Sequence, residues 1–322
     1  MLNMLILEVL KQYSDEAHPL TQQEILRRLK EDYDMDCDRR SVKSNIVSLQ
    51  EMGYEIAEEN GYYLAEREFE EAELRMLIDS VLFSKTLTET QARGLIEKLE
   101  SFGNRYFKSG ISHVAMAGGM NRSENKQTWY VLDAINEAIE QNKKITFQYT
   151  SYGTDFRRHS RPHEYVMNPY QLVAANGNYY LMGNMDKYDT ISYYRIDRMA
   201  NVQLLEETRK PSEQVKGMER GLDLPKHMAE HVYMFSGESV SITLKTTPGT
   251  MDALVDWFGR NFRILEEKDD SMLVRLRCNE NAMFYWALQY GPYVEVLEPA
   301  SLRARLAETT AAMDEKYHQN RQ

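Results

Sequence analysis

The chain has 322 residues, more than a single hydrophobic core usually serves, so two to four domains are expected. Hydrophobic residues make up 42% of it, and no apolar run approaches the roughly 18 to 20 residues that span a bilayer. The net charge of −11 argues against a general affinity for nucleic acid. The apolar start lacks the features of a signal peptide, and the two distant cysteines form neither a metal-ligand spacing nor a disulfide framework. These features indicate a cytoplasmic protein with inert thiols and no membrane partner.

Residues 1–65 show the pattern of three helices followed by a hairpin. Apolar residues recur at helical spacing over residues 2–13. Thr21 and Glu24 form a capping box that opens a second helix, and Asp38 stands where it can cap a third. Asn60-Gly61 is typical of a two-residue hairpin turn. We therefore predict a winged helix-turn-helix DNA-binding domain over residues 1–65.

The third helix carries the residues that we predict to contact DNA. Its apolar face is Val42, Ile46 and Leu49, and the polar residues suited to phosphates and base edges are Arg39, Arg40, Lys43, Ser44 and Asn45. A solvated helix face is the alternative interpretation. Residues 1–65 have a net charge of −6, and Glu58-Glu59 at the hairpin would repel phosphates. We therefore expect contact through the third helix, with two heads of a dimer reading one operator.

Two helical patterns follow over residues 70–102, inside a segment, 66–107, that we expect either to pack against a second subunit or to brace the head. Residues 108–127 lack periodicity and contain Gly118-Gly119. This stretch predicts a linker and marks the clearest domain boundary.

Residues 128–210 predict a helix and then a small closed β-barrel. The helix covers 129–139, and the short strands cover 145–150, 157–165, 170–174, 179–183, 191–196 and 202–206. Residues 225–322 change rhythm: over 239–319 they predict strand, helix, two strands, helix, strand and a final helix, a ferredoxin-like βαββαβ order. The expected fold class is thus α+β and multidomain, with a winged helix-turn-helix, an Sm/SH3-like barrel and a ferredoxin-like C-terminal domain.

The barrel segment also holds a basic, aromatic patch, because residues 141–205 carry a net charge of +3 in an acidic chain. Guanidinium groups bind phosphate bidentately and aromatic faces stack on bases. The residues that we predict to bind an anionic effector are Tyr149, Arg161, His163, Tyr170, Tyr180, Arg195 and Arg198. On a strand, Asp197 would share a face with Arg195 and orient it or Arg198 through an internal salt bridge. Packing in the core is the alternative for such tyrosines, and we favour it for Tyr179 and Leu181.

The patch resembles the WYL domain of bacterial transcription regulators. Asn168-Pro-Tyr170-Gln-Leu172, Tyr179-Tyr180-Leu181 and Tyr194-Arg195-Ile-Asp197-Arg198-Met match the family's motifs, although Tyr179 replaces its tryptophan. The resemblance covers nearly the whole chain. It implies a homodimeric regulator whose barrel binds a nucleotide or nucleic-acid effector and thereby changes its affinity for double-stranded operator DNA.

Two further classes of function stay open. The barrel and C-terminal domain would bind RNA or single-stranded DNA as the working activity if the acidic head were a protein-interaction module. An enzyme acting on a nucleotide is the weakest alternative, because no nucleophile elbow, phosphate-binding glycine loop or histidine ligand spacing is found. We predict a protein that is not an enzyme and has no metal site or cofactor.

Overall fold

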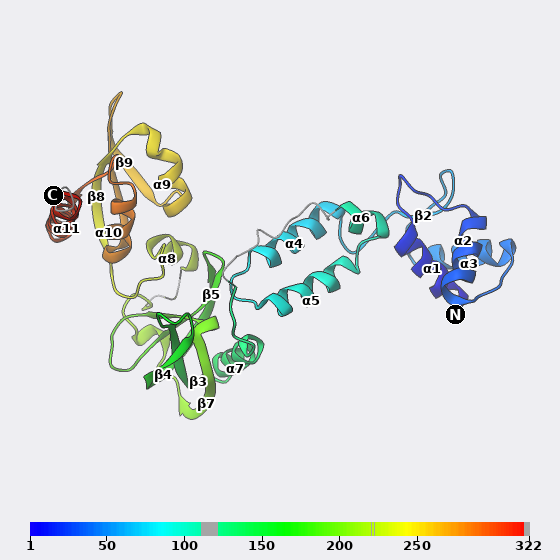
Figure 1. Cartoon of the computed structure of the whole chain (residues 1–322), viewed down its shortest axis with the longest axis horizontal. Helices are drawn as coiled ribbons and strands as arrows, with labels where there is room; N and C mark the ends of the chain where they lie inside the picture. Colours follow the sequence, from blue (N-terminus) through cyan, green and yellow to red (C-terminus); the bar gives the residue numbers. More distant parts are fainter. Residues whose placement is uncertain (111–121, 220, 222, 319–322) are drawn as a thin grey trace. The chain divides into compact units, whose positions relative to one another are not determined.

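The computed structural model describes residues 1–110, 122–219, 221 and 223–318 (Figure 1). It divides into two compact units, Met1–Glu124 and Asn125–Gln322, which are treated separately below. The division falls within the predicted linker 108–127, of which residues 111–121 lie outside the described part. Within the described part, every helix is too short or too polar to cross a membrane.

Three helices and a short hairpin form the start of unit 1, as the periodicity predicts. They are α1 (Leu2–Tyr13), α2 (Gln22–Tyr33), α3 (Arg39–Glu51), β1 (Ile56–Ala57) and β2 (Tyr63–Leu64). The capping box of Thr21 with Glu24 is present, and the Asp38 carboxylate accepts the Ser41 N–H at 2.7 Å. The inward apolar residues of the three helices share one core with Leu20, Ile56 and Leu64. Local signals therefore determine this part of the fold.

The predicted two-residue turn is wrong in its length, because residues 58–62 all connect β1 to β2. Tyr62 does not continue the hairpin ladder but exchanges backbone hydrogen bonds of 2.8 and 2.9 Å with Leu20. Gly61 has φ +147°, and a Cβ there would lie 2.8 Å from the Leu20 carbonyl oxygen. Tyr62 thus pairs with Leu20, which precedes α2, and does not form part of a tight turn. The Asn60-Gly61 motif alone does not reveal this long-range pairing.

Unit 1 continues with α4 (Glu71–Phe83), α5 (Glu89–Glu100) and α6 (Arg105–Gly110). Leu74, Ile78 and Leu82 of α4 form a small core with Phe107. The prediction of an unstructured linker from residue 108 is wrong at its start, because α6 reaches Gly110. The Asn104 side chain causes this by accepting the N–H groups of Tyr106 and Phe107 at 2.9 and 2.8 Å, which caps the helix.

Unit 2 begins with α7 (Thr128–Glu140), which lies against a five-stranded antiparallel sheet (Figure 1). The strands are β3 (Lys143–Tyr152), β4 (Arg158–Ala175), β5 (Asn178–Asn184), β6 (Ser192–Arg195) and β7 (Met199–Thr208), in the order β6-β5-β4-β3-β7. The predicted closed barrel is not found among these strands. After β6 the chain turns through a 3-10 helix, η2 (Ile196–Arg198), and β7 pairs with β3, so no described pairing joins β6 to β7.

The two predicted strands 157–165 and 170–174 are one strand of 18 residues, β4. Its first part pairs with β3 as far as Met167, and from Asn168 onward it pairs with β5. The register shifts between Pro169 and Gln171. Asn-Pro usually ends a strand. Here the proline stands where the strand changes partner, and the irregular pairing at this point tolerates the lack of an N–H donor.

The rest of unit 2 has the predicted order of elements, preceded by α8 (Leu224–Glu230), which the sequence did not predict. The remaining elements are β8 (Ser239–Thr246), α9 (Met251–Phe258), β9 (Phe262–Glu267), β10 (Met272–Asn279), α10 (Glu280–Gln289), β11 (Glu295–Glu298) and α11 (Ala300–His318). The strands form one antiparallel sheet in the order β11-β8-β10-β9. Phe258 and Trp286 pack against each other in its core. The molecule is therefore a mixed α/β multidomain protein.

Candidate functional site

The first part of the candidate site is the exposed side of α3. Val42, Ile46 and Leu49 have no exposed surface, whereas four of the five predicted contact residues are exposed: Arg39, Arg40, Lys43 and Ser44. The Asp38 cap fixes the first turn of the helix. These four side chains are therefore exposed to solvent, as the helical spacing predicts.

Arg39 and Arg40 are the first two residues of α3, where the helix dipole disfavours positive charge by about 0.3–1 kcal/mol. Within the described residues, no carboxylate lies at ion-pair distance from them or from Lys43. Lys30 on α2 shows the contrast, because its ammonium contacts Asp34 at 2.6 Å and Asp36 at 2.8 Å. The α3 cations thus have no described ion-pair partner in the folded chain, and their side chains can bind an anion.

Asn45 differs from the other predicted DNA contacts. It is half-buried, and its amide nitrogen donates to the Ser41 carbonyl oxygen at 2.8 Å. One of the two N–H donors that could read an adenine edge is thereby used inside the helix, and the amide is turned toward the preceding turn. The sequence could not show this, because i to i−4 side-chain bonding is one of several options for an asparagine on a helix.

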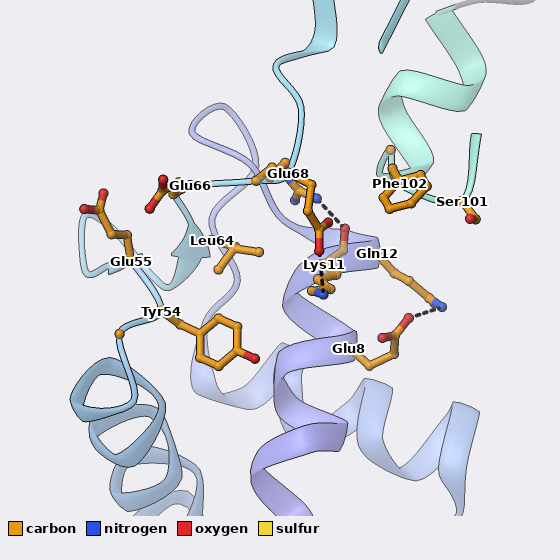
Figure 2. A pocket seen from close by; sticks show the side chains of 13 residues that line it. Glu8, Lys11, Gln12, Tyr54, Glu55, Leu64, Glu66, Glu68, Ser101 and Phe102 are labelled. Carbon is orange, nitrogen blue, oxygen red and sulfur yellow. Dashed lines mark hydrogen bonds and ion pairs between the residues drawn. The ribbon is translucent and has the colours of Figure 1, made fainter. Parts of the chain in front are cut away.

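Other surfaces of unit 1 are acidic. Glu58 and Glu59 are exposed at the hairpin. A cavity of about 500 Å³ lies beside α1, and its lining includes the carboxylates of Glu8, Glu55, Glu66 and Glu68. Figure 2 shows Glu68 next to Lys11, with Glu55 and Glu66 farther along the lining. Lys11 is held near Glu68 at 3.9 Å. The exposed carboxylates of these surfaces would repel a phosphate.

The second part of the candidate site is an aromatic surface on the five-stranded sheet. The rings of Tyr149, Tyr165 and Tyr194 lie 5.0 to 6.1 Å apart, centroid to centroid. The Arg161 guanidinium stands 5.2 Å from the Tyr149 ring and donates to the Tyr165 hydroxyl at 3.4 Å. His163 contacts the edge of Tyr165 at 4.9 Å. A cation and an imidazole are thus held over a tyrosine cluster.

Tyr165 was missed by the sequence analysis. Arg161, His163 and Tyr165 alternate along β4, so they share one face of the strand. That spacing was available as a signal, but Tyr165 was assigned only to a strand. Its role is to join the two exposed residues Arg161 and His163 to the buried ring of Tyr149.

The third part is a carboxylate shared by two arginines. Asp197 is 1% exposed, and its two oxygens accept from Arg195 Nε and Nη2 at 3.0 Å each. Arg158 contacts the same carboxylate at 3.4 Å and also donates to the Asp197 backbone carbonyl. Arg158 was missed because it lies on β4, far away in the sequence.

The predicted strand geometry of Arg195 and Asp197 is wrong, because Asp197 lies in η2 and not on a strand. The 3-10 turn folds the carboxylate back onto Arg195, so the contact exists for a different reason. Arg198 has no ion pair with Asp197 in the described residues, and its backbone carbonyl accepts from Thr150. Asp197 therefore orients Arg195 and Arg158.

The other two tyrosines predicted to bind the effector, Tyr180 and Tyr170, lie in different parts of the domain. Tyr180 is half-buried and pairs across strands with Arg195. Tyr170 lies in another apolar cluster, with its hydroxyl donating to the Lys210 carbonyl at 2.8 Å, so it does not join the other effector residues. Leu181 is fully buried, as expected, whereas Tyr179 is 43% exposed and is not core.

Burial controls the ionisation of the tyrosine cluster. It raises the pKa of Tyr194 to about 12 and raises the pKa of Tyr149 and Tyr180 above their ordinary value. The hydrogen bond to Tyr165 raises the pKa of Arg161. At neutral pH the surface therefore offers neutral hydroxyls and permanent cations, which suits an anion with a planar group. Across the described residues no group of His, Cys, Asp and Glu could hold a metal ion.

Comparisons with known proteins agree with the arrangement of unit 2. A family model described as the WYL domain matches residues 130–204, and one described as the WCX domain matches residues 238–313. The uncharacterized HTH-type transcriptional regulator YobV of Bacillus subtilis (strain 168) is 22% identical over 187 residues, which are 58% of this chain and 55% of YobV. The chain thus spans about half the length of this curated relative.

Two solved structures align over 99% of this chain. Proteasome accessory factor B/C (PafBC) of Arthrobacter aurescens is 15% identical, with 49% of its chain covered and a TM-score of 0.32. A structure described as a CRISPR Cas-related protein is 14% identical, with 84% covered and a TM-score of 0.40. Both scores are too low to establish a shared overall arrangement. Residues 130–204 thus match the WYL domain and residues 238–313 the WCX domain, and the chain is similar to a relative named as an HTH-type transcriptional regulator.

Proposed function

We propose that the protein is a DNA-binding transcriptional regulator in which residues 1–65, a winged helix-turn-helix, bind double-stranded operator DNA through α3. The observation that carries this proposal is the set of unneutralised cations at the start of α3, where the helix dipole makes them unfavourable without a bound anion. A helix start presented in this way is what the major groove accepts. The acidic hairpin and cavity restrict the contact to one helix per head, so a homodimer would be needed for tight binding.

The five-stranded sheet of unit 2, most of which lies in the stretch that matches the WYL domain, would sense an anionic effector that carries a planar group, such as a nucleotide or oligonucleotide. The support is the exposed pair Arg161 and His163 over the tyrosine cluster, with Arg195 oriented nearby by Asp197. The C-terminal βαββαβ unit, with ferredoxin-like strand order, would complete the sensor module.

The test of DNA binding is fluorescence anisotropy of the full chain with duplex fragments from around its own gene. Arg39→Ala with Arg40→Ala should weaken duplex binding at least about tenfold, because two phosphate contacts are lost. Arg93→Ala with Lys98→Ala is the matched control, since it removes two positive charges from exposed positions of α5. Equal losses in the two double variants would contradict the proposal.

The alternative is that the tyrosine surface binds RNA or single-stranded DNA as the working activity. The observation in its favour is a contrast: unit 1 has an acidic cavity, whereas the sheet of unit 2 exposes Arg161 and His163. Single-stranded oligonucleotides of both kinds, in the same titrations, distinguish the two functions. Binding to single strands alone, lost with Arg161→Ala and retained without Arg39 and Arg40, would establish the alternative.

A further inference from the structure

The α4 helix of unit 1 has an apolar side that its own core does not use. Leu74, Ile78 and Leu82 face the core. The opposite stripe, spaced at three and four residues, consists of Ala72, Met76, Ser80 and Phe83. Met76 is 71% exposed and Phe83 is 68% exposed. Two large apolar side chains so exposed on one helix stripe indicate a protein contact.

The stripe is self-complementary when two copies of the helix run antiparallel. A two-fold axis near its middle places the small Ala72 of one copy opposite the large Phe83 of the other, and Met76 opposite Ser80. The flank carries Arg75 and Asp79, whose side chains are 3.4 Å apart and about 35 to 40% exposed. The same axis brings Arg75 of each copy beside Asp79 of the other, so the charges match as well.

We infer that a second copy of this chain docks on α4, antiparallel and about a two-fold axis between Met76 and Ser80. This inference deepens the homodimer of the proposed function by giving it a surface. The contact lies in the helical segment that follows the DNA-binding domain in each chain, which makes it a suitable place to set the distance between two heads.

Sedimentation velocity of the full chain over a range of concentrations tests the surface. Phe83→Glu should raise the dimer dissociation constant at least about tenfold, because it replaces the largest apolar side chain of the contact with a charge. Met4→Glu is the matched control, since Met4 is also an exposed apolar residue on a helix of unit 1. A wild-type chain that is monomeric throughout, or a dimer equally insensitive to both changes, would overturn the inference.

Exchanging the charges on the flank gives a second readout that leaves the apolar stripe of α4 unchanged. Arg75→Glu makes the flank wholly negative, and Asp79→Lys makes it wholly positive. Each variant alone should dimerise more weakly than the wild type, and a mixture of the two should form heterodimers in preference to either homodimer. Random pairing in the mixture would contradict the antiparallel arrangement.

The outcome is separable from that of the proposed function. If the dimer depends on α4 but duplex binding is unaffected by Arg39→Ala with Arg40→Ala, the surface stands and the DNA-binding proposal fails. If α4 changes leave the dimer unaltered while the α3 variant loses duplex affinity, DNA binding stands and another surface must join the copies.

Discussion

The arginines of α3 and those of the five-stranded sheet are in opposite states. Arg39 and Arg40 project into solvent at a helix start with no described carboxylate partner. Arg195 and Arg158 are held by a carboxylate that is almost completely buried. The first pair can exchange water for a ligand phosphate at little structural cost, whereas the second pair is already part of the folded structure. Arg161, which is exposed on the sheet, resembles the α3 residues more than it resembles its neighbours.

The largest expected effect on stability comes from removing the carboxylate that holds Arg195 and Arg158. Asp197→Asn should lower the free energy of unfolding of unit 2 by about 3 kcal/mol, because two partly buried guanidinium groups lose their countercharge. Chemical denaturation measures this. Asp155→Asn is the control, since Asp155 is an exposed partner of His159 and solvent screens that pair, so its loss should change stability much less. Equal effects would show that Asp197 contributes no more than a surface carboxylate.

A smaller effect concerns His227, whose ring contacts the hydroxyl of Tyr193 on β6. Burial, together with the nearby His231, lowers the pKa of His227 to about 4. Between pH 6.5 and pH 4 the unfolded chain therefore binds a proton that the folded chain does not, so stability falls as the pH falls through this window. Allowing for partial exposure, the loss is about 1–2 kcal/mol.

Denaturation at pH 7 and pH 5 checks this, with His227→Gln compared against the wild type. The variant should lose part of the pH dependence, whereas His163→Gln, at an exposed histidine on β4, should retain it. An identical pH dependence in His227→Gln and the wild type would show that His227 does not titrate with folding.

The comparison predicts a still smaller stability change for α3. Arg39→Ala with Arg40→Ala should change the free energy of unfolding by less than about 1 kcal/mol, and in the stabilising direction, because two cations leave the positive end of a helix dipole. Thermal denaturation in parallel with the Asp197 variant tests this. Clear destabilisation by the α3 change would mean that these arginines have a structural role.

The smallest effect is expected at Asn45. Because its amide nitrogen is bonded to the Ser41 carbonyl, Asn45→Ala should weaken duplex binding less than about threefold. Lys43→Ala, on the exposed side of the same helix, should weaken it more. The reverse order would show that the Asn45 amide leaves its helix on binding DNA.

Predictability from the sequence differs between the two regions for a physical reason. The α3 surface depends on a cap, a helical period and side chains within one turn, all of which are local. The sheet surface depends on Arg158, brought to Asp197 by strand pairing, and on a 3-10 turn at Ile196–Arg198 that simple alternation does not reveal. The continuity of β4 through Pro169 was missed for the same reason, since its two halves pair with different strands.

The most direct test of the central claim is the salt dependence of duplex affinity for the wild type, Arg39→Ala and Arg161→Ala. Each phosphate contact adds about 0.9 to the slope of log affinity against log salt concentration. Arg39→Ala should therefore make the slope shallower by about 1, while Arg161→Ala should leave it unchanged. A slope that Arg161→Ala reduces and Arg39→Ala does not would place the duplex on the sheet and contradict a reader helix at α3.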